Sequence, residues 1–248
     1  MSRQKLKRAL MAPTSQILKG VLEQEREVTN NWLSGVLVGR APRQDLRPKP
    51  LRRDDTFLTN TLQSYGEIDA SLTSLQTIAK LARRSPPKNI HVDPGEQLKL
   101  FVESYLGEVY LLRERSEAMT SKLTRAYRNN ADAAQIARTL SDAYDGVSEV
   151  LSPVVVARGA HVHEQRHRDF EMDRLATLRI LSEKSDEPMF RSIRKEALRG
   201  IRKAKTQWMT AINKDITDAI DIYFAALHGV VFDGDDSPRF PTAGRRRE

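Results

Sequence analysis

The sequence predicts an all-α fold, a bundle of long antiparallel helices. Three observations lead to this prediction. Glycine and proline are scarce, with 12 and 11 among 248 residues. Apolar residues recur every three or four positions over long segments, which is the pattern of an amphipathic helix. No useful length of sequence alternates apolar and polar residues as a half-buried strand would. Helices with one apolar stripe bury it against one another, so a bundle is the simplest architecture.

The composition is that of a soluble globular chain with a modest core, because 39% of the residues are hydrophobic and 30% are charged. No segment has ~18 consecutive apolar residues, so no membrane span is expected. The basic N-terminus lacks the apolar stretch of a secretion signal, and a cytoplasmic location is the default expectation. The absence of cysteine excludes disulfides and thiolate metal sites. The formal net charge of +8 suits an anionic partner such as RNA, DNA or an acidic protein.

Four regions follow from the pattern along the chain. Residues 1–38 carry apolar side chains at roughly helical spacing and are expected to form an N-terminal helical arm or a short helix pair. Residues 39–56 are rich in proline and arginine and indicate a basic linker. Residues 57–231 hold the helices of the bundle. Residues 232–248 lack periodicity and predict a disordered tail.

The first helices of the bundle are separated by clear breaks. A helix over residues 57–82 is ended by the proline pair in "RRSPPKN". Asp93 followed by Pro94 predicts the N-cap and the first position of a long helix that reaches about Arg128.

The helix that follows Asp132 carries the most informative segment. Arg158 lies eighteen residues, about five full turns, after Leu140, so this arginine continues the apolar face of the helix. A guanidinium in such a place has to be paired or has to face a cleft. Pro153 lies inside this helix and is expected to kink it.

Two more helices complete the pattern, one capped by Asp169 and one running from about Pro188 to Val231. The last helix carries a basic stripe, formed by Arg191, Arg194, Lys195, Arg199, Arg202 and Lys203. One interpretation of this stripe is a solvated helix face. The other is an RNA-binding track for phosphates, whose affinity would fall with added salt. Aromatic residues hardly interleave with these charges, so base stacking on this face is not expected.

The segment "VVVARGAHVHEQRHR", residues 154–168, holds three of the five histidines. The sequence has no P-loop, no GxGxxG, no HExxH and no GxSxG signature. His161 and His163 are two positions apart, so on a helix they would point about 200° away from each other. This spacing disfavours a metal site. Neither a metal nor another cofactor is therefore predicted.

Arg158 and His163 match the pattern of an arginine, four residues and a histidine. The pattern lies at the end of a long apolar helix, with two helices before it and two after it. Over about residues 57–231 the chain therefore resembles the HEPN-domain family, with the motif late in the third helix of its core. The resemblance implies a metal-independent endoribonuclease, of the kind found in toxin–antitoxin and phage-defence systems. It also implies two protomers that contribute their motifs to one composite cleft.

The same resemblance implies roles for individual residues. Arg158 would stabilise the charge that develops on the phosphate oxygens, and His163 would act as acid or base, since imidazole titrates near neutral pH. Supporting or RNA-contacting positions would be His161, Arg166, His167 and Arg168. The competing interpretation is a helix C-terminus that carries cations because they favour its dipole.

The sequence departs from the family at Gly159, where the family often carries Asn or Asp. On a regular helix Arg158 and His163 are about 140° apart, so unwinding near Gly159 or a second protomer is needed to bring them to one phosphate. His161 lies only about 60° from Arg158 and is a rival for the working histidine. The alternative function is a non-catalytic helical protein that binds RNA or another protein. The expected partners are RNA, a second copy of the chain, and an antitoxin or other protein.

Overall fold

The computed structural model describes residues 2–37, 51–84, 92–163, 170–185 and 187–242, without the side chains of residues 2, 27, 28, 31–37 and 157–163. The described part of the chain is helical apart from short connections and the segment after Val231, which includes one isolated bridge between Phe232 and Pro238. The predicted all-α fold is confirmed. The helices are α1 (Ser2–Leu37), α2 (Arg53–Ala82), α3 (Pro94–Tyr127), α4 (Ala133–His163), α5 (Phe170–Lys184) and α6 (Pro188–Val231).

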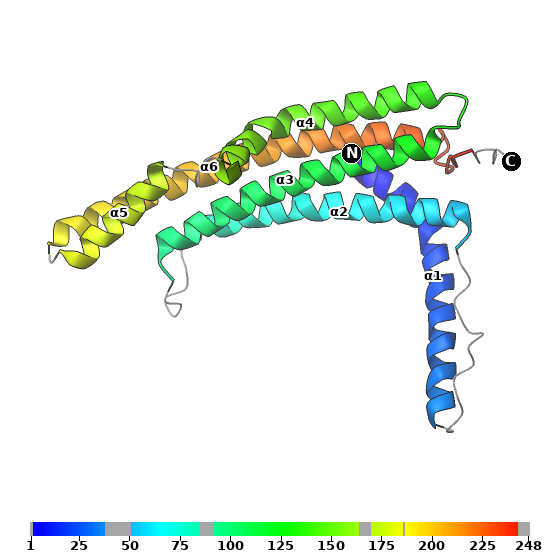
Figure 1. Cartoon of the computed structure of the whole chain (residues 1–248), viewed down its shortest axis with the longest axis horizontal. Coiled ribbons are helices and arrows are strands. Elements are labelled where there is room, and N and C mark those ends of the chain that lie inside the picture. Colours follow the sequence, from blue (N-terminus) through cyan, green and yellow to red (C-terminus); the bar gives the residue numbers. More distant parts are fainter. Residues whose placement is uncertain (1, 38–50, 85–91, 164–169, 186, 243–248) are drawn as a thin grey trace.

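Helices α2, α3, α4 and α6 form an antiparallel bundle in which α3 lies between α2 and α4, and α6 closes the ring by packing on both α4 and α2 (Figure 1). The start of α1 packs on α2 and α6, and the rest of α1 projects away from the bundle (Figure 1). At the opposite end, α5 pairs with the first half of α6 and extends beyond the other helices (Figure 1). This arrangement leaves part of α6 outside the bundle.

The core is made of the apolar stripes that the spacing predicts, and its largest fully buried side chains are those of Tyr105, Tyr127, Tyr223 and Phe224. Hydroxyl groups in this core bond across helices. Tyr105 Oη donates to Asn213 Oδ1 at 2.9 Å, which ties α3 to α6. Such bonds satisfy polar atoms that would otherwise be costly to bury.

The N-terminal region forms the expected helical arm only in part. Residues 2–37 make one helix rather than a pair, and Leu6 and Leu10 are fully buried in the same core as the bundle. The first turns of α1 are therefore part of the bundle and not a separate arm. Helix α2 begins at Arg53, inside the predicted linker. The carboxylates of Asp54 and Asp55 lie in its first turn, where they interact favourably with the positive end of the helix dipole.

The predicted disordered tail is wrong for residues 232–242. Phe232 is 3% exposed and belongs to the core. The guanidinium of Arg239 pairs with Asp132, and Tyr127 Oη donates to the Arg239 carbonyl at 2.5 Å. These contacts are made by irregular backbone, which leaves no periodicity for the sequence to show. Residues 243–248 lie outside the described part.

A shortened chain tests the role of this segment. Ending the chain at Val231 removes Phe232 from the core and the Arg239 partner of Asp132, so we expect the free energy of unfolding to fall by about 3 kcal/mol or more. A chain ending at Thr242 keeps both contacts and should stay within about 0.5 kcal/mol of the full chain. Urea unfolding measures the difference. Equal stabilities of the three chains would contradict the packing of this segment.

The buried tyrosines make stability fall in alkali. Burial raises the pKa of Tyr65 to about 12, and it also raises the pKa of Tyr105, Tyr127 and Tyr223. In the unfolded chain these hydroxyls ionise near pH ~10, so the unfolded state loses protons first and stability decreases above that pH. For Tyr65 this decline continues up to about pH 12, where the hydroxyl ionises in the folded state as well.

The Tyr65→Phe variant tests this assignment, because phenylalanine cannot ionise. We expect its free energy of unfolding to decline less steeply than that of the wild type between about pH 9 and about pH 11. The loss of the long hydrogen bond from Tyr65 Oη to the Arg3 carbonyl, 3.4 Å, shifts the curve without changing its slope. An unchanged slope in urea unfolding across this range would contradict the assignment.

Candidate nucleic-acid interface

The Arg158 and His163 positions lie in the last turns of α4. The helix continues through Pro153 and Gly159 to His163, so the backbone does not unwind at the glycine. Five positions on a continuous helix correspond to about 140° around its axis. One chain with this backbone therefore carries the two residues on different sides of α4.

Nothing further is described for the side chains of this segment. Those of Arg158, His161 and His163 lie outside the described residues, as do all atoms of Arg166, His167 and Arg168. Val154 and Val156 are among the last described side chains of α4, and they lie on different sides of the helix. Val154 is 3% exposed, whereas Val156 is 67% exposed. Arg158 follows Val154 by four positions, about one turn of the helix.

The six cations of the α6 stripe divide into two groups. Four of them are exposed, namely Arg191, Lys195, Arg199 and Lys203. None of these four makes an ion pair with a carboxylate of the described residues. The other two, Arg194 and Arg202, are half-buried and point toward the start of α3.

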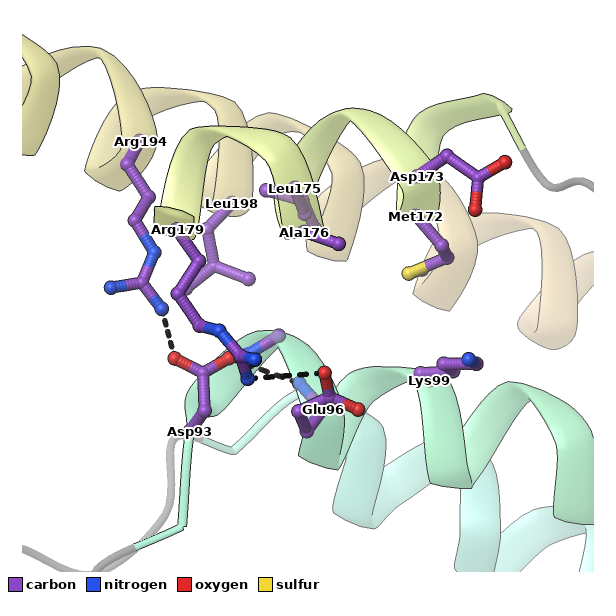
Figure 2. A pocket seen from close by; sticks show the side chains of 11 residues that line it. Asp93, Glu96, Lys99, Met172, Asp173, Leu175, Ala176, Arg179, Arg194 and Leu198 are labelled. Atoms are coloured by element: carbon purple, nitrogen blue, oxygen red, sulfur yellow. Dashed lines mark hydrogen bonds and ion pairs between the residues drawn. The ribbon is translucent and has the colours of Figure 1, made fainter. Parts of the chain in front are cut away.

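At the start of α3 the carboxylate of Asp93 binds the guanidinium of Arg194. One carboxylate oxygen of Asp93 accepts from the amides of Gly95 at 2.8 Å and Glu96 at 3.1 Å, which confirms the predicted N-cap. The other oxygen accepts from Arg194 Nη2 (Figure 2). Beside it, Arg179 Nη1 of α5 lies 3.2 Å from Glu96 Oε1 (Figure 2). Together these groups line a small cavity of about 50 Å³.

Arg202 completes the contact by donating to the carbonyl of Pro94 at 3.2 Å. Burial lowers the pKa of Arg202, but guanidinium groups start so high that it stays charged at neutral pH. Arg194 and Arg202 therefore hold α6 against the capped end of α3. Their guanidinium groups are thus bonded within the protein, and their role in RNA binding stays a prediction.

The sequence gives little sign of this contact. Asp93 and Arg194 are 101 residues apart, and nothing in the stripe separates Arg194 from its exposed neighbours. The predicted N-cap at Asp93 was the one available signal, since a capping carboxylate keeps a second oxygen free for a cation.

Two further features are absent from the described residues. No group of three or more histidine, aspartate or glutamate side chains is placed to hold a metal ion among them. Likewise, none of the described helices combines the length and the apolar character needed to cross a membrane.

Comparison with known proteins found no matching family model, and no curated protein or solved structure matches the chain.

The Asp93→Ala variant tests the contact between α3 and α6. It removes the helix cap and leaves the half-buried Arg194 without its carboxylate, so we expect the free energy of unfolding to fall by about 1–3 kcal/mol. The matched control is Asp218→Ala, an exposed position inside α6, which should change stability by no more than about 0.5 kcal/mol. Urea unfolding of both variants measures the effect. Similar losses in the two would show that the contact contributes nothing specific.

Proposed function

We propose that the protein is a HEPN-like, metal-independent endoribonuclease that acts as a homodimer. The observation that supports this best is the position of the motif. Arg158 and His163 fall in the final turns of α4, which is the third helix, in chain order, of the bundle formed by α2, α3, α4 and α6. The HEPN resemblance implies this position for an arginine and histidine that act together.

These two residue types are sufficient for cleavage of an RNA strand. The 2′-hydroxyl attacks the adjacent phosphorus, and a neutral imidazole accepts its proton. The bond to the 5′-oxygen breaks, and an imidazolium returns a proton to that oxygen. The products are a 2′,3′-cyclic phosphate and a 5′-hydroxyl end. Arg158 stabilises the charge on the non-bridging oxygens, and His163 transfers protons near neutral pH.

The continuous helix supports a site shared by two protomers. Because α4 does not unwind at Gly159, Arg158 and His163 of one chain are about 140° apart. Two copies related by a two-fold axis can place Arg158 of one chain beside His163 of the other. His161 is the second candidate for the proton transfer, and Arg166, His167 and Arg168 are candidates for RNA contacts in the same segment.

A second candidate function is RNA binding without cleavage. Gly159 favours this alternative, because it stands where the family often has a polar side chain. The exposed cations of α6 serve either function, since phosphate contacts are needed for both binding and cleavage. A toxin or phage-defence role is the biological setting that the resemblance suggests.

The central test compares the wild type with Arg158→Ala, His161→Ala and His163→Ala on total RNA in EDTA. We expect the wild type to cut without added metal and to leave 5′-hydroxyl ends. Arg158→Ala and His163→Ala should each slow cleavage by about 100-fold or more. Arg138→Ala, which removes an exposed arginine at the start of α4, should cleave like the wild type. Cleavage at the wild-type rate by folded Arg158→Ala and His163→Ala proteins would refute the proposed site.

Mixing the two inactive variants tests the shared site. In a mixed dimer one of the two sites keeps both residues, so random exchange should restore about a quarter of wild-type activity. A site within one chain would give no restoration. If the wild type binds RNA but never cuts it, the second candidate function replaces the first.

A further inference from the structure

One side of α6 packs on α2 and then continues beyond it. Arg83 Nη2, just after the last residue of α2, donates to Thr210 Oγ1 at 2.7 Å. Asn213 Nδ2 donates to the Leu75 carbonyl of α2 at 3.3 Å. Thr210 and Asn213 therefore mark the side of α6 that faces α2. Because α2 ends at Ala82, the same side of α6 has no α2 beside it before Thr210.

The exposed cations of α6 lie on this uncovered side. On a helix of 100° per residue, Lys195 precedes Asn213 by five full turns and points the same way. Arg199 and Lys203 lie within about 20° of Thr210, and Arg191 within about 40° of Asn213. All four side chains are exposed. These four cations form an exposed row on α6, and the row lies beyond the point where α2 ends.

The end of α2 adds charge of the same sign. Lys80 and Arg84 are exposed there, and the bond from Arg83 to Thr210 holds this end about two turns from Lys203 along α6. Residues 70–84 of the chain contain no carboxylate, and residues 188–214 contain only Glu196. The excess of positive charge is therefore concentrated at the end of α2 and the first half of α6.

The carboxylates at the start of α3 do not neutralise this charge. Asp93 is bonded to Arg194, and Glu96 is bonded to Arg179. The cations in these two pairs, Arg194 and Arg179, do not belong to the exposed row. A polyanion that reaches the row thus meets charges without partners among the described carboxylates.

We infer that Lys80 and Arg84 of α2, with Arg191, Lys195, Arg199 and Lys203 of α6, form one basic track that binds the phosphate backbone of RNA. From Arg191 to Lys203 the α6 part of the track is about 18 Å long, at 1.5 Å per residue. The end of α2, which contacts α6 at Thr210, extends it, so the track contacts several phosphates in succession. Successive cations of α6 are four residues apart, about 6 Å along the helix. The track deepens the proposed function, on which it rests, by assigning the surface that receives the RNA.

Two features favour RNA backbone over an acidic protein. Half of the six cations of the track are lysines, which are depleted in protein interfaces. The end of α4 with Arg158 and His163 lies at the same end of the bundle as the uncovered part of α6 (Figure 1). Contacts of this kind recognise phosphate without reading base sequence.

Charge reversal tests the track with 2′-O-methyl RNA, which lacks the attacking hydroxyl and so reports binding without cleavage. We expect Lys195→Glu/Arg199→Glu and Lys80→Glu/Arg84→Glu each to weaken binding by about 10-fold or more. Each should also reduce the slope of log affinity against log salt by about one to two. The matched control, Lys7→Glu/Arg8→Glu, reverses two exposed cations of α1 and should stay within about 2-fold of the wild type. Circular dichroism confirms that all three variants keep their helices.

Each outcome separates the track from the catalytic proposal. If both track variants bind the RNA as the wild type does while the wild type cleaves ordinary RNA, the track is wrong and the ribonuclease stands. If the track variants lose binding but the wild type never cleaves, the track stands and the catalytic proposal fails. Poly-glutamate is the second probe. Binding of poly-glutamate as tight as that of RNA at equal salt, with equal loss in the track variants, would assign the track to acidic proteins and overturn the RNA assignment.

Discussion

The structure depends on α6 being longer than the helix it packs against. Helix α6 has 44 residues and α2 has 30, so the apolar seam of α6 cannot be covered by α2 along its whole length. The second half of α6 completes the core through residues such as Tyr223 and Phe224. The first half leaves the bundle, where exposure of a long bare helix would be unfavourable without other partners.

Two sets of contacts hold the first half of α6. Helix α5 packs along one side, and Lys205 Nζ lies 3.0 Å from Glu171 Oε2 across this contact. On another side Arg194 and Arg202 meet the start of α3. Asp93 serves both helices there, because it caps α3 and also accepts from Arg194. A helix N-terminus and its capping carboxylate together offer favourable partners for an arginine that must be partly buried.

This construction connects the fold with the proposed chemistry. The side of α6 that extends past the end of α2 carries four exposed cations, and α4 ends at the same end of the molecule (Figure 1). The four exposed cations on this side of α6 carry no desolvation cost because they stay in water. Arg194 and Arg202 are half-buried, and burial is tolerated because each guanidinium has an acceptor. A continuous α4 gives its two motif positions different directions, which is why the proposed cleavage site takes residues from two chains.

The amino-acid pattern by itself determined the helices. Apolar spacing and the Asp93–Pro94 start predicted α3 to within a residue, and Pro188 to Val231 was predicted as it is found. It also determined the charge and the motif at the end of α4. Only the tertiary structure decided which cations are free. Arg194 and Lys195 are neighbours in sequence, yet one meets a carboxylate 101 residues away and the other meets solvent. Contacts between residues so far apart in the sequence depend on where the helices end in space. Helical periodicity in the sequence does not determine those positions.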